Sequence, residues 1–147
     1  MATELSDTAR AFLDAHAVAH LATAGADCAP HVVPLCYARI GDRLYFVADD
    51  KPKRHGPRAL KRLANIAANP RVALVVDDYD PDWSRLAYLL VHLDAAIVSD
   101  DAEYDAALAA LRGRYPQYKE MELQRATHPI VRMTPYRCHL WRSGDSL

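Results

Sequence analysis

The sequence predicts a mainly β protein with helices (α+β), in which about six antiparallel strands curl into a small barrel. Two observations point to this class. Short segments rich in β-branched and aromatic residues are separated by turn signals such as "GAD" and "GD". The helical segments do not alternate with the strands as they would in a Rossmann-type fold. A barrel is then the natural closure, because it leaves few exposed strand edges.

The first third of the chain is expected to contain one helix and three strands. The apolar residues within 5–16 recur at helical spacing, and Ser6 or Asp7 can cap this helix. The period then changes to that of short strands. We expect these strands to form an antiparallel meander at residues 17–24, 30–40 and 43–48.

The rest of the chain is expected to hold two more helices and three more strands. A helix at 58–70 stops at Pro70, and another at 100–116 opens with two acidic residues and runs to Gly113. The strands are expected at 71–77, 86–99 and within 129–142.

The composition describes one folded domain spanning residues 1–147, with 51% hydrophobic and 25% charged residues. The three cysteines are odd in number and show no C-x-x-C spacing, which argues against a disulfide framework and a zinc knuckle. No basic N-terminal region precedes an apolar core, and no apolar run reaches the ~20 residues of a membrane span. We therefore expect a cytoplasmic protein with no membrane partner.

Positive charge is concentrated in the stretch "DDKPKRHGPRALKRLANIAANPRV", although the net charge of the chain is −1. Its positions 51–62 alone contain six of the 18 Lys and Arg residues, namely Lys51, Lys53, Arg54, Arg58, Lys61 and Arg62. Three interpretations are open: a solvated helix face, a nucleic-acid patch, or a pocket for a phosphate-bearing small molecule.

The residues favour an anion site. Pro52 stiffens the loop that carries the first charges, and Lys61 and Arg62 lie near the start of a helix, where free N–H groups and the helix dipole favour phosphate. No aromatic residue lies between 49 and 72 to stack on bases, which argues against nucleic acid. Neither a P-loop nor a G-x-G-x-x-G motif is present.

Other polar clusters give no catalytic or metal-binding pattern. The acidic run "DDYDPDW" lacks the glycine and the closing Glu of an EF-hand, so we expect a capped turn before Trp83. The seven histidines form neither H-E-x-x-H nor H-x-H, and no serine lies in a G-x-S-x-G elbow. We therefore expect no bound metal and identify no catalytic acid or base.

Three segments, in this order, resemble one family: "HLATAGADCAPHVVPLCYA", "GDRLYFVADDKPKR" and "LKRLANIAANPRVALVVDDYDPDW". They are similar to the pyridoxamine 5′-phosphate oxidase-like FMN-binding split barrels, most of all to the branch of coenzyme F-420 (deazaflavin)-dependent enzymes. The resemblance covers roughly residues 12–100 and, more loosely, the C-terminal strand with "LW". It implies a six-stranded antiparallel split β-barrel of the FMN-binding type.

The resemblance also implies a homodimer whose cofactor, FMN or coenzyme F-420, lies in a groove between the subunits. The basic pair of the family motif corresponds to Lys61 and Arg62, which would hold the cofactor phosphate. The phosphate-facing position of the second strand corresponds to His31, where the family often has Arg. Phe46 and Val47 match positions that border the ring system.

The loop after the third strand resembles the longer loop of the deazaflavin branch, whose cofactor tail carries extra negative charge. The resemblance assigns Lys51, Lys53 and Arg54 to this tail, and Trp83 matches a Trp of that branch. Tyr88 lies in the strand that borders the expected groove. The chain departs from the branch at Ala87, Tyr88, Leu90 and Leu93, where two Trp, an Arg and a Gly are usual. The choice among FMN, coenzyme F-420 and loss of the cofactor stays open.

The function that the resemblance implies is a flavin- or deazaflavin-dependent oxidoreductase acting on a small-molecule substrate that one sequence does not identify. The alternative is a non-catalytic flavin- or haem-binding or sensing protein, since the family includes members that bind haem or have lost catalysis.

Overall fold

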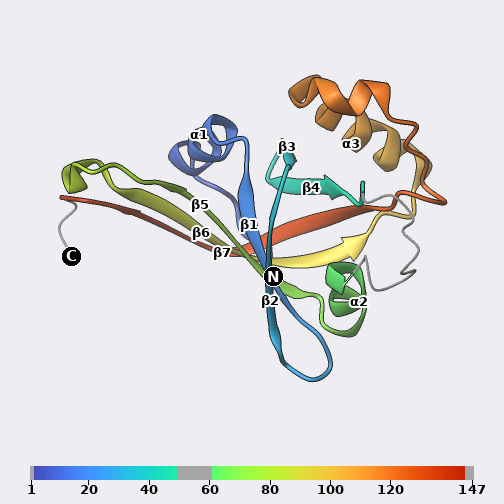
Figure 1. The fold of residues 1–147 in the computed structure, drawn as a ribbon, viewed down its shortest axis with the longest axis horizontal. Coiled ribbons are helices and arrows are strands. Elements are labelled where there is room, and N and C mark those ends of the chain that lie inside the picture. The colour runs from blue at the N-terminus through green and yellow to red at the C-terminus, as the bar shows by residue number, and fades with distance from the viewer. Residues whose placement is uncertain (1, 50–60, 145–147) are drawn as a thin grey trace.

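The computed structural model describes residues 2–49 and 61–144, which form one curled antiparallel sheet with three α-helices around it (Figure 1). The strands are β1 (Ala19–Ala24), β2 (Pro30–Leu35), β3 (Ala38–Ile40), β4 (Arg43–Val47), β5 (Arg71–Asp78), β6 (Ala87–Ile97) and β7 (Ile130–Arg142). The helices are α1 (Asp7–Ala15), α2 (Lys61–Ala68) and α3 (Asp101–Arg114), with 3₁₀ turns η2 (Trp83–Arg85) and η3 (Pro116–Glu120).

The sheet is a half-closed barrel. Its seven strands follow the order β2-β1-β5-β6-β7-β4-β3, and every neighbouring pair is antiparallel. The two edges, β2 and β3, are both short, which limits the unpaired backbone that they expose. Pro34 lies in the edge strand β2, where a residue without an N–H is tolerated.

The prediction of six strands is wrong, because the single strand expected at 30–40 breaks after Leu35. The backbone at the break bonds to α3 and its C-cap instead of to a neighbouring strand. The Tyr37 N–H donates to Tyr115 Oη at 3.1 Å, and the Tyr37 carbonyl accepts from Tyr115 Oη at 2.8 Å and from Arg114 Nη1 at 3.0 Å. The predicted meander is therefore also wrong, since β2 and β3 lie at opposite edges of the sheet.

The three expected helices are confirmed for the described residues. The Ser6 Oγ accepts from the Ala9 N–H at 3.1 Å, and the Asp100 carboxylate accepts from the Glu103 N–H at 2.8 Å, so a side chain caps α1 and α3. The first described residue of α2 is Lys61. None of the helices in the described part of the chain is long and apolar enough to cross a membrane.

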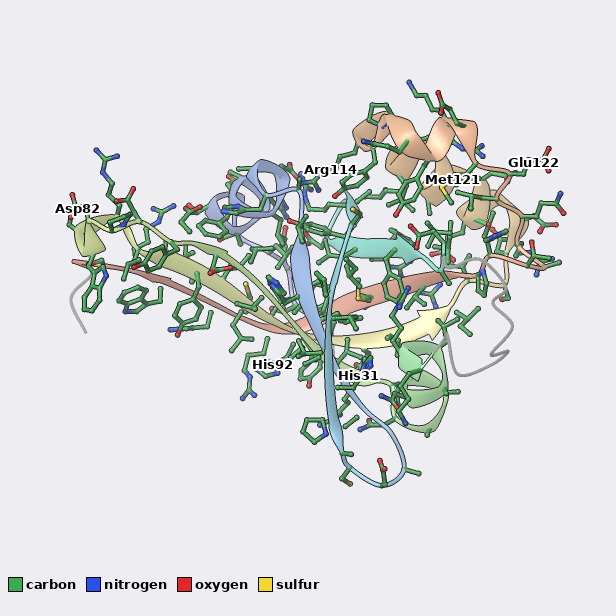
Figure 2. The ribbon with its side chains drawn as sticks, viewed as in Figure 1. His31, Asp82, His92, Arg114, Met121 and Glu122 are labelled. Atoms are coloured by element: carbon green, nitrogen blue, oxygen red, sulfur yellow. The ribbon has the colours of Figure 1, made fainter. Side chains whose placement is uncertain are left out.

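Strands β5, β6 and β7 extend beyond the barrel as a long three-stranded arm with η2 at its tip, at the far left of Figure 1. A bulge between His92 and Leu93 interrupts the β6–β7 register, which bends the sheet where the arm joins the barrel. Helix α1 stands over one face of the arm (Figure 1). Figure 2 shows His92 projecting from the opposite face, which we call the outer face of the arm.

Two hydrophobic clusters fill the two sides of the sheet. The first lies within the curl and includes α1, α2 and the inward residues of the strands, among them Phe46. The second lies between α3 and the outer side of β3, β4 and β7, and includes Tyr45 and Val47. Because successive side chains of a strand point to opposite faces, β4 contributes alternately to both clusters.

Arg114 joins three elements at the open end of the barrel, where Figure 2 labels it between α1 and α3. Its guanidinium donates to the carbonyl oxygens of Leu13, Asp14 and His16 at the end of α1, and lies 4.7 Å from the ring centroid of Tyr37. A cation at a helix C-terminus satisfies carbonyl groups that have no partner within the helix. Arg114 therefore fixes α1 in place.

Candidate functional site

The start of α2 brings a cation onto an aromatic ring of the barrel. The Cζ atom of Arg62 lies 5.8 Å from the centroid of the Phe46 ring, within the range of a cation–π contact. Phe46 is only 1% exposed, so its ring is a fixed part of the inner cluster. Arg62 is half-buried and Lys61 is exposed at the first turn of the helix. The structure therefore joins Arg62 and Phe46, two residues assigned to cofactor binding by the resemblance.

A buried polar contact holds α2 against the β1–β2 hairpin. Asn65, only 1% exposed, donates from Nδ2 to Thr23 Oγ1 at 2.9 Å. Its Oδ1 lies so close to the backbone of Gly25 that a Cβ atom there would approach it to 2.6 Å. A glycine at this position is what allows the helix to pack so closely. Sequence reasoning missed Asn65; the only signal was a polar residue among the apolar positions of the helix.

His31 points toward the same side of the sheet as this contact. It pairs directly with Thr23 across β2 and β1, and directly paired residues place their side chains on the same face. Thr23 faces α2, so His31 does as well, and Figure 2 labels it on β2 near that helix. The Nδ1 atom of His31 is buried and has no hydrogen-bond partner among the described residues. A buried ring nitrogen of this kind is suited to a ligand oxygen.

The polar side chains near α2 can bind an anion. Lys61 and Arg62 each carry a positive charge, and both lie in the first described turn of α2. His31 adds an imidazole from the neighbouring hairpin. The remaining predicted anchor residues, Lys51, Lys53 and Arg54, lie outside the described residues, so their assignment stays a prediction.

The other predicted residues lie apart from α2. Val47 is buried in the cluster beneath α3, on the face of β4 opposite to Phe46. Trp83 begins η2 at the tip of the arm and is 68% exposed. Tyr88 lies on the outer face of the arm, where its ring stacks on Trp141 with centroids 5.7 Å apart. Within one chain, therefore, Val47, Trp83 and Tyr88 do not join the residues around Phe46.

An aromatic surface covers the outer face of the arm. Besides the Tyr88–Trp141 stack, it contains the ring pairs Tyr88–His139 and His92–Tyr136, each with centroids 6.1 Å apart. A hollow of about 430 Å³ lies beside the stack, lined in part by His20, Val75, Tyr79, Tyr88 and Trp141. Sequence reasoning noted the "LW" pair only as a loose match; the pairing of β6 with β7 is what places Trp141 on Tyr88.

Two titratable side chains beneath α3, Cys36 and Tyr118, are kept in their protonated forms. Burial raises the pKa of the Cys36 thiol, which keeps it protonated and weakly nucleophilic. Burial, and then the charge of Asp49, raise the pKa of Tyr118, whose hydroxyl donates to Asp49 Oδ2 at 2.9 Å. No group of three or more His, Cys, Asp or Glu side chains in residues 2–49 and 61–144 is arranged to hold a metal ion.

Several solved structures have a fold similar to that of this chain. A search among curated proteins gives no match. A FAD-binding protein from Mesorhizobium loti is 23% identical with a TM-score of 0.67, covering 94% of this chain and 95% of that one. The haem storage protein HutZ from Vibrio cholerae is 17% identical with a TM-score of 0.67, covering 97% and 96%. An F-420 reductase is 27% identical with a TM-score of 0.62, covering 92% and 98%.

The likeness to these structures supports the half-closed barrel. The family described as pyridoxamine 5′-phosphate oxidase matches residues 5–142, which include the whole sheet and all three helices. This chain therefore belongs to the pyridoxamine 5′-phosphate oxidase family.

Proposed function

We propose that this protein is an oxidoreductase that uses FMN or coenzyme F-420, bound between two copies of the chain. The observation that carries this proposal is the position of Arg62 over Phe46, with His31 facing the same helix. A phosphate-bearing cofactor with a planar ring needs a cation for the phosphate and an apolar border for the ring. Family membership and the similarity to an F-420 reductase support a cofactor of the flavin type.

The residues of this chain would bind and orient the cofactor. Arg62 and Lys61 would pair with phosphate oxygens, and the buried Nδ1 of His31 would face one of them. Phe46, buried beneath the Arg62 guanidinium, would hold that cation in position beside the cofactor. A bound flavin or deazaflavin itself supplies the hydride chemistry, so the protein needs no catalytic acid or base for that step.

The outer face of the arm is the surface we propose for the second copy. It presents Tyr88, Trp141 and Leu90 on adjacent strands, with Val75 beside them on β5. An exposed surface with stacked aromatic side chains is typical of a protein interface. A homodimer through this face would cover the aromatic surface and bring Tyr88, and Trp83 at the tip of the arm, next to another chain.

Separate titrations with FMN and with coenzyme F-420, followed by fluorescence, test the proposed cofactor site. The double variant Lys61→Ala/Arg62→Ala is expected to weaken binding about 100- to 10,000-fold, because two charged contacts are lost and each costs about 1.5–3 kcal/mol. The matched control Lys119→Ala/Arg125→Ala removes the same two charge types from η3 and from a residue paired with α3, and should bind normally. Equal affinity in the site variant and the wild type would contradict the assignment of Lys61 and Arg62.

Turnover distinguishes an enzyme from a cofactor-binding protein. Chemically reduced cofactor is supplied in excess together with menadione as electron acceptor, and its oxidation is followed by absorbance. Many turnovers per protein above the rate of free cofactor support an oxidoreductase. A rate equal to that of free cofactor identifies a binding or storage protein instead.

Haem binding is a second candidate, which the imidazoles on the outer face favour. His20 and His139 lie in one cross-strand row with Val75 and Leu90 between them, and His92 lies in the next row. Imidazole next to apolar and aromatic surface suits an axially ligated haem. Haem storage by the similar protein HutZ supports this alternative. Titration with haemin, read from the Soret band, should then show a band that His139→Ala or His92→Ala abolishes and His128→Ala leaves intact.

A further inference from the structure

A cavity of about 790 Å³ lies between α1 and the arm, on the face opposite to the aromatic surface. One wall consists of Ala11, Phe12 and Ala15 of α1. The other wall is a cross-strand row in which Ala87 is flanked by Asp78 on β5 and Arg142 on β7. None of the described residues of α2 lines this cavity, and Figure 1 shows α2 well apart from α1 and the tip of the arm, so this cavity is separate from the proposed cofactor anchor in the same chain.

The wall of the cavity is held in place by His16. Its Nδ1 bonds to the Phe12 carbonyl oxygen at 2.6 Å, and its Nε2 lies 2.7 Å from Asp78 Oδ1. The ring also stacks on Phe12, with centroids 4.3 Å apart. Because this contact joins α1 to β5 and Arg114 bonds to the last carbonyl groups of α1, the cavity is preformed.

The charges that line the cavity leave one cation available. The Asp78 carboxylate contacts His16, and Asp7 pairs with Arg10 at 2.9 Å. Arg85 lies 4.0 Å from Asp82. Arg142, by contrast, forms no ion pair with an acidic residue in the described ranges 2–49 and 61–144. The two carboxylates of the lining are thus already engaged, whereas a guanidinium is open to a ligand.

We propose that this cavity binds a small organic anion, a carboxylate with a compact apolar body. The guanidinium of Arg142 takes the carboxylate, since its fork of N–H donors matches the two oxygens. The hydroxyls of Thr8 and Ser143 lie on the same lining and add hydrogen bonds. The apolar body packs on Ala11, Ala15 and Ala87, whose small side chains leave the space open. A cation is not the ligand, because Asp78 and Asp7 already have partners.

The first test compares benzoate with two compounds that share its ring: benzylamine, which carries a positive charge, and benzamide, which is neutral. The full-length protein is titrated with each compound, and backbone amide resonances are followed by NMR. Benzoate is expected to shift the amides of Ala11, His16 and Ser143 in a saturable manner, and benzylamine and benzamide are not. Shifts located elsewhere, or equal shifts with benzylamine, overturn the proposal.

Two variants then test the two walls separately. Arg142→Gln removes the cation, and Ala11→Leu fills the apolar wall with a residue that is a good helix former at an exposed position. Each variant is expected to weaken benzoate binding about tenfold, which is roughly the effect of losing one charged contact or one well-packed apolar contact. Lys119→Gln, an equal charge change in η3, should bind benzoate as the wild type does. Unchanged affinity in both site variants, with the wild-type fold retained by circular dichroism, overturns the proposal.

Discussion

The guanidinium of Arg62 lies over the ring of Phe46, with 5.8 Å between the Arg62 Cζ atom and the ring centroid. This contact joins the first turn of α2 to the middle of β4, although fifteen positions of the chain separate the two residues. Phe46 is buried, so the position of its ring is decided by the inner cluster, and the ring in turn positions the cation. The charge that the proposed cofactor needs is therefore held by the barrel itself.

A double-mutant cycle measures the energy of this contact. Arg62→Gln and Phe46→Leu, made singly and together, should show a coupling of about 0.5–2 kcal/mol in the free energy of unfolding, as expected for a partly desolvated cation–π pair. Urea denaturation followed by circular dichroism gives the four values. Effects that add within about 0.3 kcal/mol would show that the contact contributes nothing.

Gly25→Ala should destabilise the protein by about 1–3 kcal/mol, because its new Cβ would lie 2.6 Å from Asn65 Oδ1 and force α2 away from β1. The affinity for FMN should fall as well if α2 carries the anchor. Gly113→Ala is the matched control: nothing lies within 4 Å of its Cβ, and Ala is favoured in a helix by about 0.5–1 kcal/mol. Thermal unfolding that ranks Gly25→Ala at or above the wild type would contradict the close packing of α2.

Tyr37 should make the stability depend on pH at the alkaline end. Burial raises the pKa of Tyr37 to about 12 from an ordinary value of 10.0, because the neutral phenol is the form that a buried site favours. Its contribution is fully present below pH 10 and is lost as the pH rises toward 12. Tyr37→Phe should cost about 1 kcal/mol at neutral pH and flatten this alkaline loss. Urea unfolding of both proteins between these limits measures the difference; equal slopes would refute it.

Glu103 should act in the opposite direction at the acid end. Burial alone would raise the pKa of Glu103, but the hydrogen bonds from Tyr45 Oη and Arg132 Nη1, both at 2.8 Å, together lower it below its ordinary value of 4.5. Its stabilising effect is therefore present above pH 4.5 and is lost as the pH falls below that value. In Glu103→Gln, the free energy of unfolding should fall less steeply as the pH is lowered than it does in the wild type. Arg132→Gln should show part of the same change. A wild-type slope in both variants would exclude this role.

Leu90→Asp should prevent the proposed homodimer. Leu90 lies at the centre of the outer face, between Val75 and His139 on the neighbouring strands, and a carboxylate there would be buried without a partner in a dimer. Light scattering after size-exclusion chromatography should give the mass of two chains for the wild type and of one for the variant. Ile40→Asp, an exposed position on the edge strand β3, serves as the control and should remain dimeric. A monomeric wild type would contradict the homodimer.

The predictions from sequence succeed where local periodicity carries the information. Ser6, one of the two residues expected to cap the first helix, caps α1, and Asp100, one of the two acidic residues expected at the start of the last helix, caps α3. Both are predictable because a cap depends on a few neighbouring residues. The strand expected at 30–40 fails for a non-local reason. Its residues have strand character throughout, but Tyr115 and Arg114 take the backbone groups of Tyr37, and those residues lie more than seventy positions away.

The same division applies to the candidate site. The sequence by itself determined the family resemblance, the cluster of basic residues and the position of the basic pair Lys61 and Arg62 near the start of a helix, since each is a pattern of residues close together in the chain. Only the tertiary structure decided that Arg62 meets Phe46, that Asn65 locks α2 onto Thr23, and that Val47 faces away from both. The physical reason is that strand pairing and sheet curvature bring these side chains together, and both are set by packing across the whole barrel rather than by any one segment.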